Sequence, residues 1–386
     1  MINKSNNFLK SFKKIFSNKS ARLHDPLFKG NEKKYLVDCI NTSFVSYVGN
    51  YVSLFEKKLA KYTKCKYAVA TSSGTSALHL ILKYLKVGEN DEVLMPTSTY
   101  VATAAAVVYC NSTPNFVDIE NENLGICPIK LKSYLKRISK KKGNFYYNKK
   151  SGKKIKALIV VHLYGFPSKI LEIKKVCKIF NIKVIEDAAE ALGSFYNKKH
   201  LGTFSEAGIL SFNGNKTITC GGGGAIITNN KNMAQKLKHL SVHAKKSGSD
   251  DHIHDDVGFN YRMTNLSAAV GCAQMENLSK ILKAKRKNYK TYENLFKKEN
   301  EIKILKEPKN SKTNYWLIIA LVKRDNLKKK IINFYKRKGY GFRSTWRPLH
   351  SLKIFKTYPR DKINNANIFF NKAINLPSSP IINYEK

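Results

Sequence analysis

The sequence predicts an α/β fold with a mostly parallel sheet. From about residue 35 onward, short uninterrupted apolar runs alternate with segments of helical periodicity. Continuous apolar runs are typical of parallel strands, because crossover helices bury both faces of such a sheet. One of these runs, Lys183-Val-Ile-Glu-Asp, ends in carboxylates. Open α/β sheets bind ligands at the carboxyl ends of their strands, so Asp187 is a candidate site residue.

The expected elements follow one another in regular order. Strands are expected at 67–70, 92–95, 113–117, 156–161 and 183–187, and helices at 78–85, 100–109 and 170–180. The lysine-rich stretch 140–154 contains Asn-Lys-Lys-Ser-Gly, which predicts a hairpin or an exposed excursion. Beyond about Gln274 the chain becomes a charged helix and then mixed segments. We therefore expect a large domain over residues 25–274 and a smaller domain over 275–386.

The first 24 residues contain no acidic residue, and their apolar residues recur at helical spacing among lysines. Two interpretations stay open for residues 1–24. They form either a basic tail or an amphipathic helix whose residues 1–20 contact an anionic membrane surface. The segment lacks the apolar core and cleavage site of a secretory signal.

Composition limits the classes of function. Lys and Arg number 70 against 27 acidic residues, for a formal net charge of +43, which suggests nucleic acid as a partner. The basic residues are spread along the whole chain, which favours a compositional bias instead, so no nucleic-acid partner is expected. Seven scattered cysteines without a Cys-x-x-Cys pair predict a reducing cytoplasm.

The polar stretch 247–256 contains His252 and His254 among aspartates. Their spacing matches no familiar metal-binding pattern. We expect an exposed loop there, and no metal site.

A turn rich in small residues, Thr71-Ser-Ser-Gly-Thr-Ser, lies between an expected strand and an expected helix. Free N–H groups and the helix dipole at such a turn, together with the hydroxyls of Ser73, Thr75 and Ser76, would bind a phosphate. The alternative interpretation is a simple helix cap.

Lys216 stands just before four consecutive glycines, in Ser211-Phe-Asn-Gly-Asn-Lys. A lysine amine held in a tight backbone environment can form a Schiff base with an aldehyde cofactor. A solvated loop lysine is the alternative. Asp187 has two interpretations as well: it pairs with a protonated ring nitrogen of a cofactor, or it caps a helix.

Six segments in this order resemble fold-type I pyridoxal-phosphate enzymes, and in particular the nucleotide-sugar aminotransferases of the DegT/StrS family. They are Ser72-Ser-Gly-Thr-Ser-Ala-Leu, Pro96-Thr-Ser-Thr-Tyr-Val-Ala-Thr, Val161-His-Leu-Tyr-Gly, Glu186-Asp-Ala-Ala-Glu-Ala-Leu-Gly-Ser, Ser211-Phe-Asn-Gly-Asn-Lys and Gly258-Phe-Asn-Tyr-Arg-Met-Thr-Asn-Leu-Ser-Ala-Ala. The resemblance implies a mostly parallel seven-stranded large domain with a smaller α+β C-terminal domain.

The resemblance also implies a role for each matching residue. Lys216 would bind the cofactor's aldehyde and move the proton, and Asp187 would hold the pyridine nitrogen. Glu190 would lie near the cofactor's phenolic oxygen, and Tyr100 would stack on its ring. The phosphate would be held by Gly74, Thr75 and Ser211, and Asn260 would reach the phosphate of the cofactor in a neighbouring subunit. A homodimer with shared active sites follows. His162 is either a supporting residue or a packed strand-end histidine. Arg262, Arg343 and Arg347 are candidates for binding the donor carboxylate or the nucleotide diphosphate.

The details point to one branch of the family. Asn213 and Gly222 replace the usual His and Glu of the family, and the Asn-Gly-Asn-Lys form resembles the branch acting on UDP-4-keto-6-deoxy-N-acetylhexosamines in bacillosamine and legionaminic acid pathways. The implied function is transfer of an amino group from glutamate to C4 of such a sugar, for surface polysaccharide biosynthesis. Alternatives are a dehydratase on the same fold, in which His replaces the lysine, and a basic protein that binds nucleic acid or a membrane surface.

Overall fold

The computed structural model describes residues 21–246 and 252–383. The expected membrane contact of residues 1–20 and the first half of the 247–256 loop therefore lie outside the described residues. Within the described ranges, no helix is long and apolar enough to cross a membrane. All seven cysteines lie in these ranges as free thiols.

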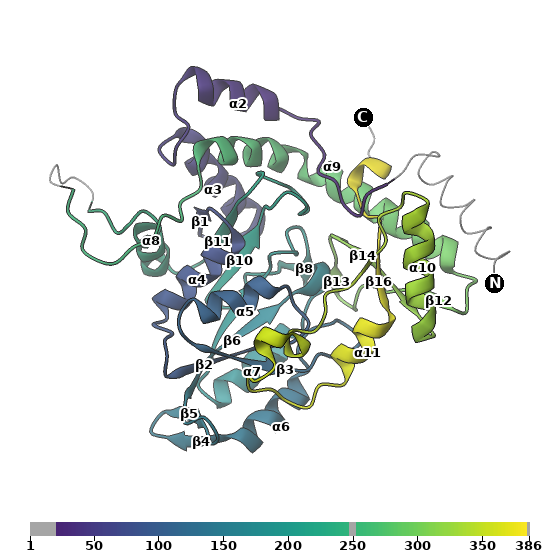
Figure 1. Cartoon of the computed structure of the whole chain (residues 1–386). Coiled ribbons are helices and arrows are strands. Elements are labelled where there is room, and N and C mark those ends of the chain that lie inside the picture. Colours follow the sequence, from purple (N-terminus) through teal and green to yellow (C-terminus); the bar gives the residue numbers. More distant parts are fainter. Residues whose placement is uncertain (1–20, 247–251, 384–386) are drawn as a thin grey trace.

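A large sheet forms the centre of the molecule (Figure 1). Its order is β1 (Tyr67–Thr71), β11 (Gly224–Thr228), β10 (Ala207–Ser211), β7 (Lys183–Asp187), β6 (Lys154–Val161), β2 (Asp91–Pro96) and β3 (Thr113–Val117). The pairs from β10 to β3 are parallel, and β11 pairs antiparallel with both β1 and β10. The predicted mostly parallel large sheet is thereby confirmed, together with all five expected strands. The sheet has nine strands, where seven were expected.

The lysine-rich excursion is the predicted hairpin. Strands β4 (Ser139–Lys142) and β5 (Phe145–Asn148) pair antiparallel, and β5 bonds to β6 through Tyr147 and Lys154. The hairpin extends the sheet from seven strands to nine.

Alternating side chains divide the sheet's two faces between two cores. On β2, Val93 and Met95 belong to one core and Leu94 to the other, as the two-residue period of a strand requires. The first core includes residues of α4 (Gly74–Tyr84), α5 (Val101–Val108) and α8 (Lys231–Leu240). The second includes residues of α3 (Asn50–Thr63), α6 (Pro128–Ile138), α7 (Ile170–Ile179) and α9 (Asn265–Phe296). The result is three layers, with helices on both faces of the sheet.

A second, antiparallel sheet occupies the C-terminal part of the chain. Its order is β12 (Ile302–Ile304), β14 (Ile318–Val322), β16 (Ala373–Leu376) and β15 (Arg343–Ser344), with α10 (Asp325–Arg337) and α11 (Asn365–Lys372) beside it. The α+β character expected for residues 275–386 matches this arrangement. The division at residue 274 stays a prediction, because α9 runs across it without a break.

Smaller elements complete the chain. They are α2 (Glu32–Asn41), the three-stranded sheet β13 (Ser311–Lys312), β8 (Phe195–Tyr196) and β9 (Lys199–His200), and the 3-10 turns Leu163–Gly165, Leu349–Ser351, Lys353–Phe355 and Pro380–Ile382. Helix α2 packs on α9, and Figure 1 shows α9 running from there toward the C-terminal sheet.

A buried lysine ties distant segments to α9. The Lys285 amine lies 2.9 Å from His24 Nε2, 3.1 Å from the Trp316 carbonyl oxygen and 2.8 Å from the Ser378 carbonyl oxygen. Burial lowers the pKa of Lys285 well below its usual value. One side chain thus links the start of the described chain, its end and the segment that carries Trp316.

Candidate active site

The carboxyl ends of the parallel strands open into a cavity of about 450 Å³. Seven of the eight predicted site residues line it: Gly74, Thr75, Tyr100, Asp187, Glu190, Ser211 and Lys216. These residues span 143 positions of the chain and come from the starts of α4 and α5 and from the segments that follow β7 and β10. Trp316, Arg343 and Trp346 from the C-terminal part form the remaining wall.

One end of the cavity offers unpaired backbone donors. Helix α4 begins at Gly74, and its N-cap Ser73 accepts a hydrogen bond from the Ser76 N–H at 3.0 Å. The first N–H groups of a helix have no intrahelical acceptor, so those of Gly74 and Thr75 are free to bind an anion. A Cβ on Gly74 would lie 3.1 Å from the Ser211 Cβ, which shows how closely the turn approaches β10.

The glycine run after Lys216 packs against this turn. A Cβ on Gly224, the first residue of β11, would lie 2.4 Å from the Gly74 backbone nitrogen. Only glycine allows this approach of the two backbones. Gly221 has a φ of +78° and Gly223 a φ of +149°, which side chains rarely adopt. The run therefore shapes the chain between Lys216 and β11.

Asp187 ends β7 with its carboxylate buried. The Thr103 hydroxyl donates to Oδ2 at 2.9 Å, and the Ala189 N–H donates to Oδ1 at 3.1 Å. Burial raises the pKa of Asp187, while these hydrogen bonds and the Lys216 charge oppose the rise. Thr103 was not singled out from the sequence; it lies in the first turn of α5, three residues after the N-cap Tyr100.

Lys216 lies between a carboxylate and an aromatic ring. Its amine is 3.5 Å from Glu190 Oε1 and 4.1 Å from the centre of the Trp316 ring. The Tyr164 N–H donates to Glu190 Oε2 at 2.6 Å. Burial raises the pKa of Glu190 to about 7, with the Lys216 charge acting in the opposite direction. Glu190 can therefore take up or release a proton near neutral pH.

An aromatic wall closes the cavity on the C-terminal side. The Tyr164 ring stacks on Trp346 at 5.0 Å, and Trp346 lies 5.5 Å from the Tyr100 ring and 6.0 Å from Trp316. The Trp316 indole N–H donates to the Asn215 carbonyl oxygen at 2.6 Å, beside Lys216. The sequence placed both tryptophans in the C-terminal part without a role. Their rarity, two in 386 residues, is the only signal that marked them.

Four further residues were candidates from the sequence: His162 and three arginines. The buried His162 ring is 3.0 Å from Glu186 Oε2 and does not line the cavity, which agrees with both interpretations of this residue. Arg262 is buried, with Nη1 2.6 Å from Glu56 Oε1 and 2.9 Å from the Ala70 carbonyl oxygen. Arg347 is exposed, with its guanidinium over the Phe370 ring. Of the three arginines, Arg343 alone lines the cavity.

Asn260 is exposed and lies outside the cavity of its own chain, where its backbone bridges to Val242. His252 and His254 contact Lys245 and the His243 carbonyl oxygen, respectively. Among the described residues, no group of three or more His, Cys, Asp or Glu side chains is arranged to hold a metal ion.

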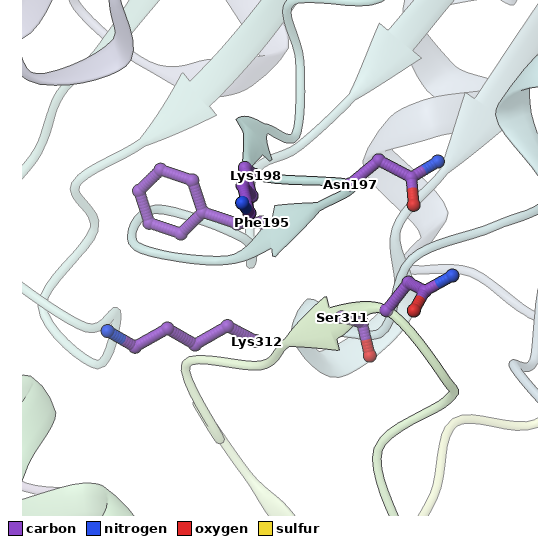
Figure 2. Close-up of a pocket in the computed structure, with 6 residues that line it drawn as sticks. Phe195, Asn197, Lys198, Ser311 and Lys312 are labelled. Atoms are coloured by element: carbon purple, nitrogen blue, oxygen red, sulfur yellow. The ribbon is translucent and has the colours of Figure 1, made fainter.

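A second hollow lies between the β8–β9 hairpin and β13. Figure 2 shows Phe195, Asn197 and Lys198 on one side and Ser311 and Lys312 on the other. Its lining includes no carboxylate and none of the predicted site residues. The cavity at Lys216 is therefore the candidate active site.

Comparison with known proteins agrees with this geometry. The sequence profile of the DegT/DnrJ/EryC1/StrS aminotransferase family matches residues 26–386. The chain belongs to this family. It is 35% identical over 372 residues to the GDP-perosamine synthase of Escherichia coli O157:H7, covering 94% of each chain. It is 29% identical to the UDP-4-amino-4,6-dideoxy-N-acetyl-beta-L-altrosamine transaminase of Campylobacter jejuni, covering 85% of each.

The fold is shared with Spr1654 of Streptococcus pneumoniae in its PLP form, at a TM-score of 0.83 and 24% identity over 93% of this chain and 94% of that one. The protein is thus a pyridoxal-phosphate-dependent aminotransferase of fold type I. The donor set fits this cofactor. Unpaired N–H groups and a hydroxyl at one end of the cavity suit its phosphate, and a buried carboxylate and a lysine at the other suit its ring and aldehyde.

Glu190 predicts a pH dependence of stability in the cofactor-free protein. Its pKa is about 7 in the folded chain against an ordinary value of 4.5, so folding favours the protonated form. This stabilisation is complete below about pH 4.5 and is lost as the pH rises through about 7. Glu190→Gln should remove up to about 3 kcal/mol of that pH dependence of the free energy of unfolding.

Urea unfolding of wild type and variant across this pH range measures the difference. Glu206→Gln, which alters an exposed pair with Lys183, serves as the matched control and should leave the wild-type pH dependence intact. Parallel curves for wild type and Glu190→Gln would contradict the assignment.

Proposed function

We propose that the enzyme transfers an amino group from glutamate to C4 of a nucleotide-linked 4-keto-6-deoxy sugar, for surface polysaccharide biosynthesis in the cytoplasm. The observation that carries the proposal is the position of the Lys216 amine, 3.5 Å from Glu190 in a cavity that also contains the buried Asp187. Membership of the aminotransferase family supports the reaction type, and the names of the relatives support a sugar as acceptor.

Different residues would bind different parts of the cofactor. Gly74, Thr75 and Ser211 would hold its phosphate, Tyr100 would face its ring, and Asp187 would keep its pyridine nitrogen protonated. When bound, pyridoxal phosphate carries the amino group and withdraws electrons from the carbon that loses its proton. The Thr103 hydroxyl fixes the orientation of Asp187 and favours its charged form, because it donates to that carboxylate.

Lys216 is the general acid and base of the proposal. Its amine would hold the cofactor's aldehyde end and then move the proton between the substrate carbon and the cofactor. Glu190 stands within reach of this amine and has a pKa of about 7, so it can take up or release a proton as the charge of Lys216 changes. The Trp316 ring lies over the amine, which is 4.1 Å from the ring centre, and the lysine side chain is 12% exposed.

The identity of the nucleotide has two candidates. The Asn213-Gly-Asn form before Lys216 supports a UDP-linked N-acetylhexosamine, as does the name of the Campylobacter relative. The higher identity to a GDP-perosamine synthase supports a GDP-linked sugar. A cavity of about 450 Å³ does not enclose both cofactor and sugar nucleotide, so the nucleotide would extend over the basic surface.

A homodimer with shared sites completes the proposal. Eight large apolar side chains between residues 28 and 54 are at least 40% exposed: Phe28, Val37, Ile40, Phe44, Val45, Tyr47, Val48 and Leu54. Exposed apolar groups in such number mark an interaction surface. Asn265 joins this segment to the start of α9, because its amide donates to the Phe44 carbonyl oxygen at 2.6 Å. Asn260, five residues earlier in the chain, is also exposed.

The alternatives are less well supported. A dehydratase of this family would carry His in place of the lysine, and this chain has Lys216. A protein that binds nucleic acid or a membrane surface explains the charge of +43, but it does not account for the cavity or the family membership.

Product analysis tests the reaction. With glutamate, the holoenzyme should convert either UDP-4-keto-6-deoxy-N-acetylglucosamine or a GDP-linked 4-keto-6-deoxyhexose to the 4-amino sugar, detected by mass spectrometry. Lys216→Ala should reduce turnover by about 10³-fold or more, because it removes the acid and base. Lys198→Ala, at the hollow of Figure 2, is the control and should keep full activity. A dehydrated product without nitrogen, or no turnover of either sugar, would refute the proposal.

Mixing of inactive variants tests the shared site. Lys216→Ala and Asn260→Ala should each lower activity in pure form. After unfolding and refolding together, random pairing should restore about a quarter of wild-type activity, because each heterodimer contains one intact site.

Light scattering tests the proposed dimer surface. The Phe44→Asp, Val48→Asp double variant should give single chains, whereas Ile129→Asp, at an exposed position of α6, should stay dimeric. No recovery in the mixture, or a dimer that persists in the double variant, would contradict the shared site.

A further inference from the structure

Residues 136–156, which include the β4–β5 hairpin, carry a concentrated positive charge. Nearly half of them are lysine or arginine and none is acidic, whereas less than a fifth of the whole chain is basic. Within the described residues the segment makes two ion pairs, Arg137 with Asp361 and Lys156 with Asp91. Six other lysines of the segment are exposed: Lys136, Lys140, Lys141, Lys142, Lys149 and Lys150. Compositional bias alone does not account for such a segment without acids.

The hairpin is fixed at its base and at its turn. The fully buried Glu92 of β2 accepts hydrogen bonds from the Asn148 amide at 3.0 Å and from the Ser151 hydroxyl at 2.5 Å. At the turn, the Asn181 amide donates to the Asn144 carbonyl oxygen at 2.9 Å. The backbone that carries the lysines is therefore preorganised, which lowers the entropy cost of binding a partner.

The two faces of the hairpin differ. Lys142 of β4 is directly opposite Phe145 of β5, and Lys140 is directly opposite Tyr147. Residues two apart on a strand share a face, as do directly opposite residues, so these four side chains lie on one face, called the basic face below. The other face is covered, because the Tyr146 ring packs at 4.9 Å against the phenylalanine that caps the end of α7. The basic face thus combines lysines with aromatic rings.

Phe145 lies at the edge of the basic face, next to the turn of the hairpin. It is 39% exposed, and the Lys154 amine lies over its ring, 3.0 Å from the ring centre. Burial and the charge of the neighbouring Lys156 lower the pKa of Lys154. Positive charges are thus crowded around an exposed aromatic ring, and a negatively charged surface would relieve their repulsion.

We propose that the basic face of the β4–β5 hairpin docks on the surface of an anionic lipid bilayer, with its lysines against the headgroups and the Phe145 ring edge in the interfacial region. Lysine clusters combined with exposed aromatic rings bind such surfaces. A single-stranded nucleic acid is the poorer match, because its bases need open ring faces to stack on, and Lys154 occupies a face of Phe145. In addition, Arg137 is the segment's one arginine, the residue type that recognises phosphate in fixed geometry.

Docking through the basic face would leave the active site open. Strand β6 bonds to the hairpin at its first residue, Lys154, and its last residue, Val161, lines the active-site cavity. The two ends of this strand are about 23 Å apart at the usual rise per residue. Catalysis and membrane contact would therefore use opposite ends of the sheet. The inference goes beyond the proposed function and does not depend on it.

Sedimentation with lipid vesicles tests the docking. Vesicles of equal parts phosphatidylglycerol and phosphatidylcholine should bind the full-length protein at about 0.1 M NaCl, and vesicles of phosphatidylcholine alone should not. The hairpin variant carries four substitutions at exposed positions: Lys140→Gln, Lys142→Gln, Lys149→Gln and Lys150→Gln. Its partition coefficient should fall about 100-fold or more, because each lysine near an anionic bilayer contributes about fivefold. Phe145→Ala alone should lower the coefficient about threefold, because it removes the interfacial ring.

The matched control removes the same number of charges from α10 and its C-cap, on the opposite side of the molecule from the hairpin in Figure 1: Lys329→Gln, Lys330→Gln, Lys336→Gln and Lys338→Gln. Its partition coefficient should change less than about threefold, because charges distant from the bilayer are screened. Both variants should keep wild-type turnover, which shows that they fold.

Three results would overturn the inference. The first is a wild-type protein that does not bind the anionic vesicles. The second is an equal loss of binding in the hairpin variant and the control, which would mean that net charge alone attracts the protein. The third is a hairpin variant that binds vesicles like wild type but loses binding to a single-stranded oligonucleotide, which would make nucleic acid the partner. None of these results bears on the aminotransferase reaction, which product analysis tests separately.

Discussion

The site depends on two carboxylates, those of Asp187 and Glu190, which are buried together at the carboxyl ends of the parallel strands. A buried carboxylate is costly unless hydrogen bonds and an opposite charge compensate it. Here the compensation comes from four directions: the Thr103 hydroxyl and the Ala189 N–H for Asp187, and the Tyr164 N–H and the Lys216 amine for Glu190. Removal of Lys216 would therefore alter the charge balance of the site as well as its chemistry.

The sheet determines where these carboxylates lie. Strand β7 is between β6 and β10, and Asp187 is in register with Val161 on one side and Ile209 on the other. The peptide bonds of three parallel strands thus position a single side chain. The phosphate turn depends on the same sheet, because Gly224 of β11 allows the start of α4 to approach its backbone. The phosphate turn and Asp187 are thus held by regular structure, which is more rigid than a loop, whereas Lys216 lies in the segment between β10 and β11.

The C-terminal wall is joined to this centre by a few polar contacts. Trp316 donates to the Asn215 carbonyl oxygen next to Lys216, and its own carbonyl oxygen accepts from Lys285 of α9. These contacts connect segments about 100 and 31 residues apart. These contacts therefore fix the position of the C-terminal wall relative to Lys216. Both the sugar and the amino donor would have to fit between them.

Much of the large sheet was predictable, because strands buried on both faces appear as apolar runs; β2, β3, β6 and β7 are of this kind. Strands β10 and β11 were missed, since Ala207–Ser211 and Gly224–Thr228 contain glycine and no long apolar run.

Motifs predicted seven residues of the cavity because each motif is local. The roles of Thr103 and Trp316 depend on contacts between distant segments, which a single sequence does not show. Arg262 illustrates the reverse case: the sequence made it a candidate for binding substrate, but in the structure its guanidinium is paired with Glu56.

The most direct test of the account is borohydride reduction of the cofactor-loaded protein, followed by peptide mapping. The arrangement of Lys216, Glu190 and Asp187 in one cavity predicts a single pyridoxyl adduct, on Lys216. An adduct on any other lysine of the chain, or none at all, would contradict it.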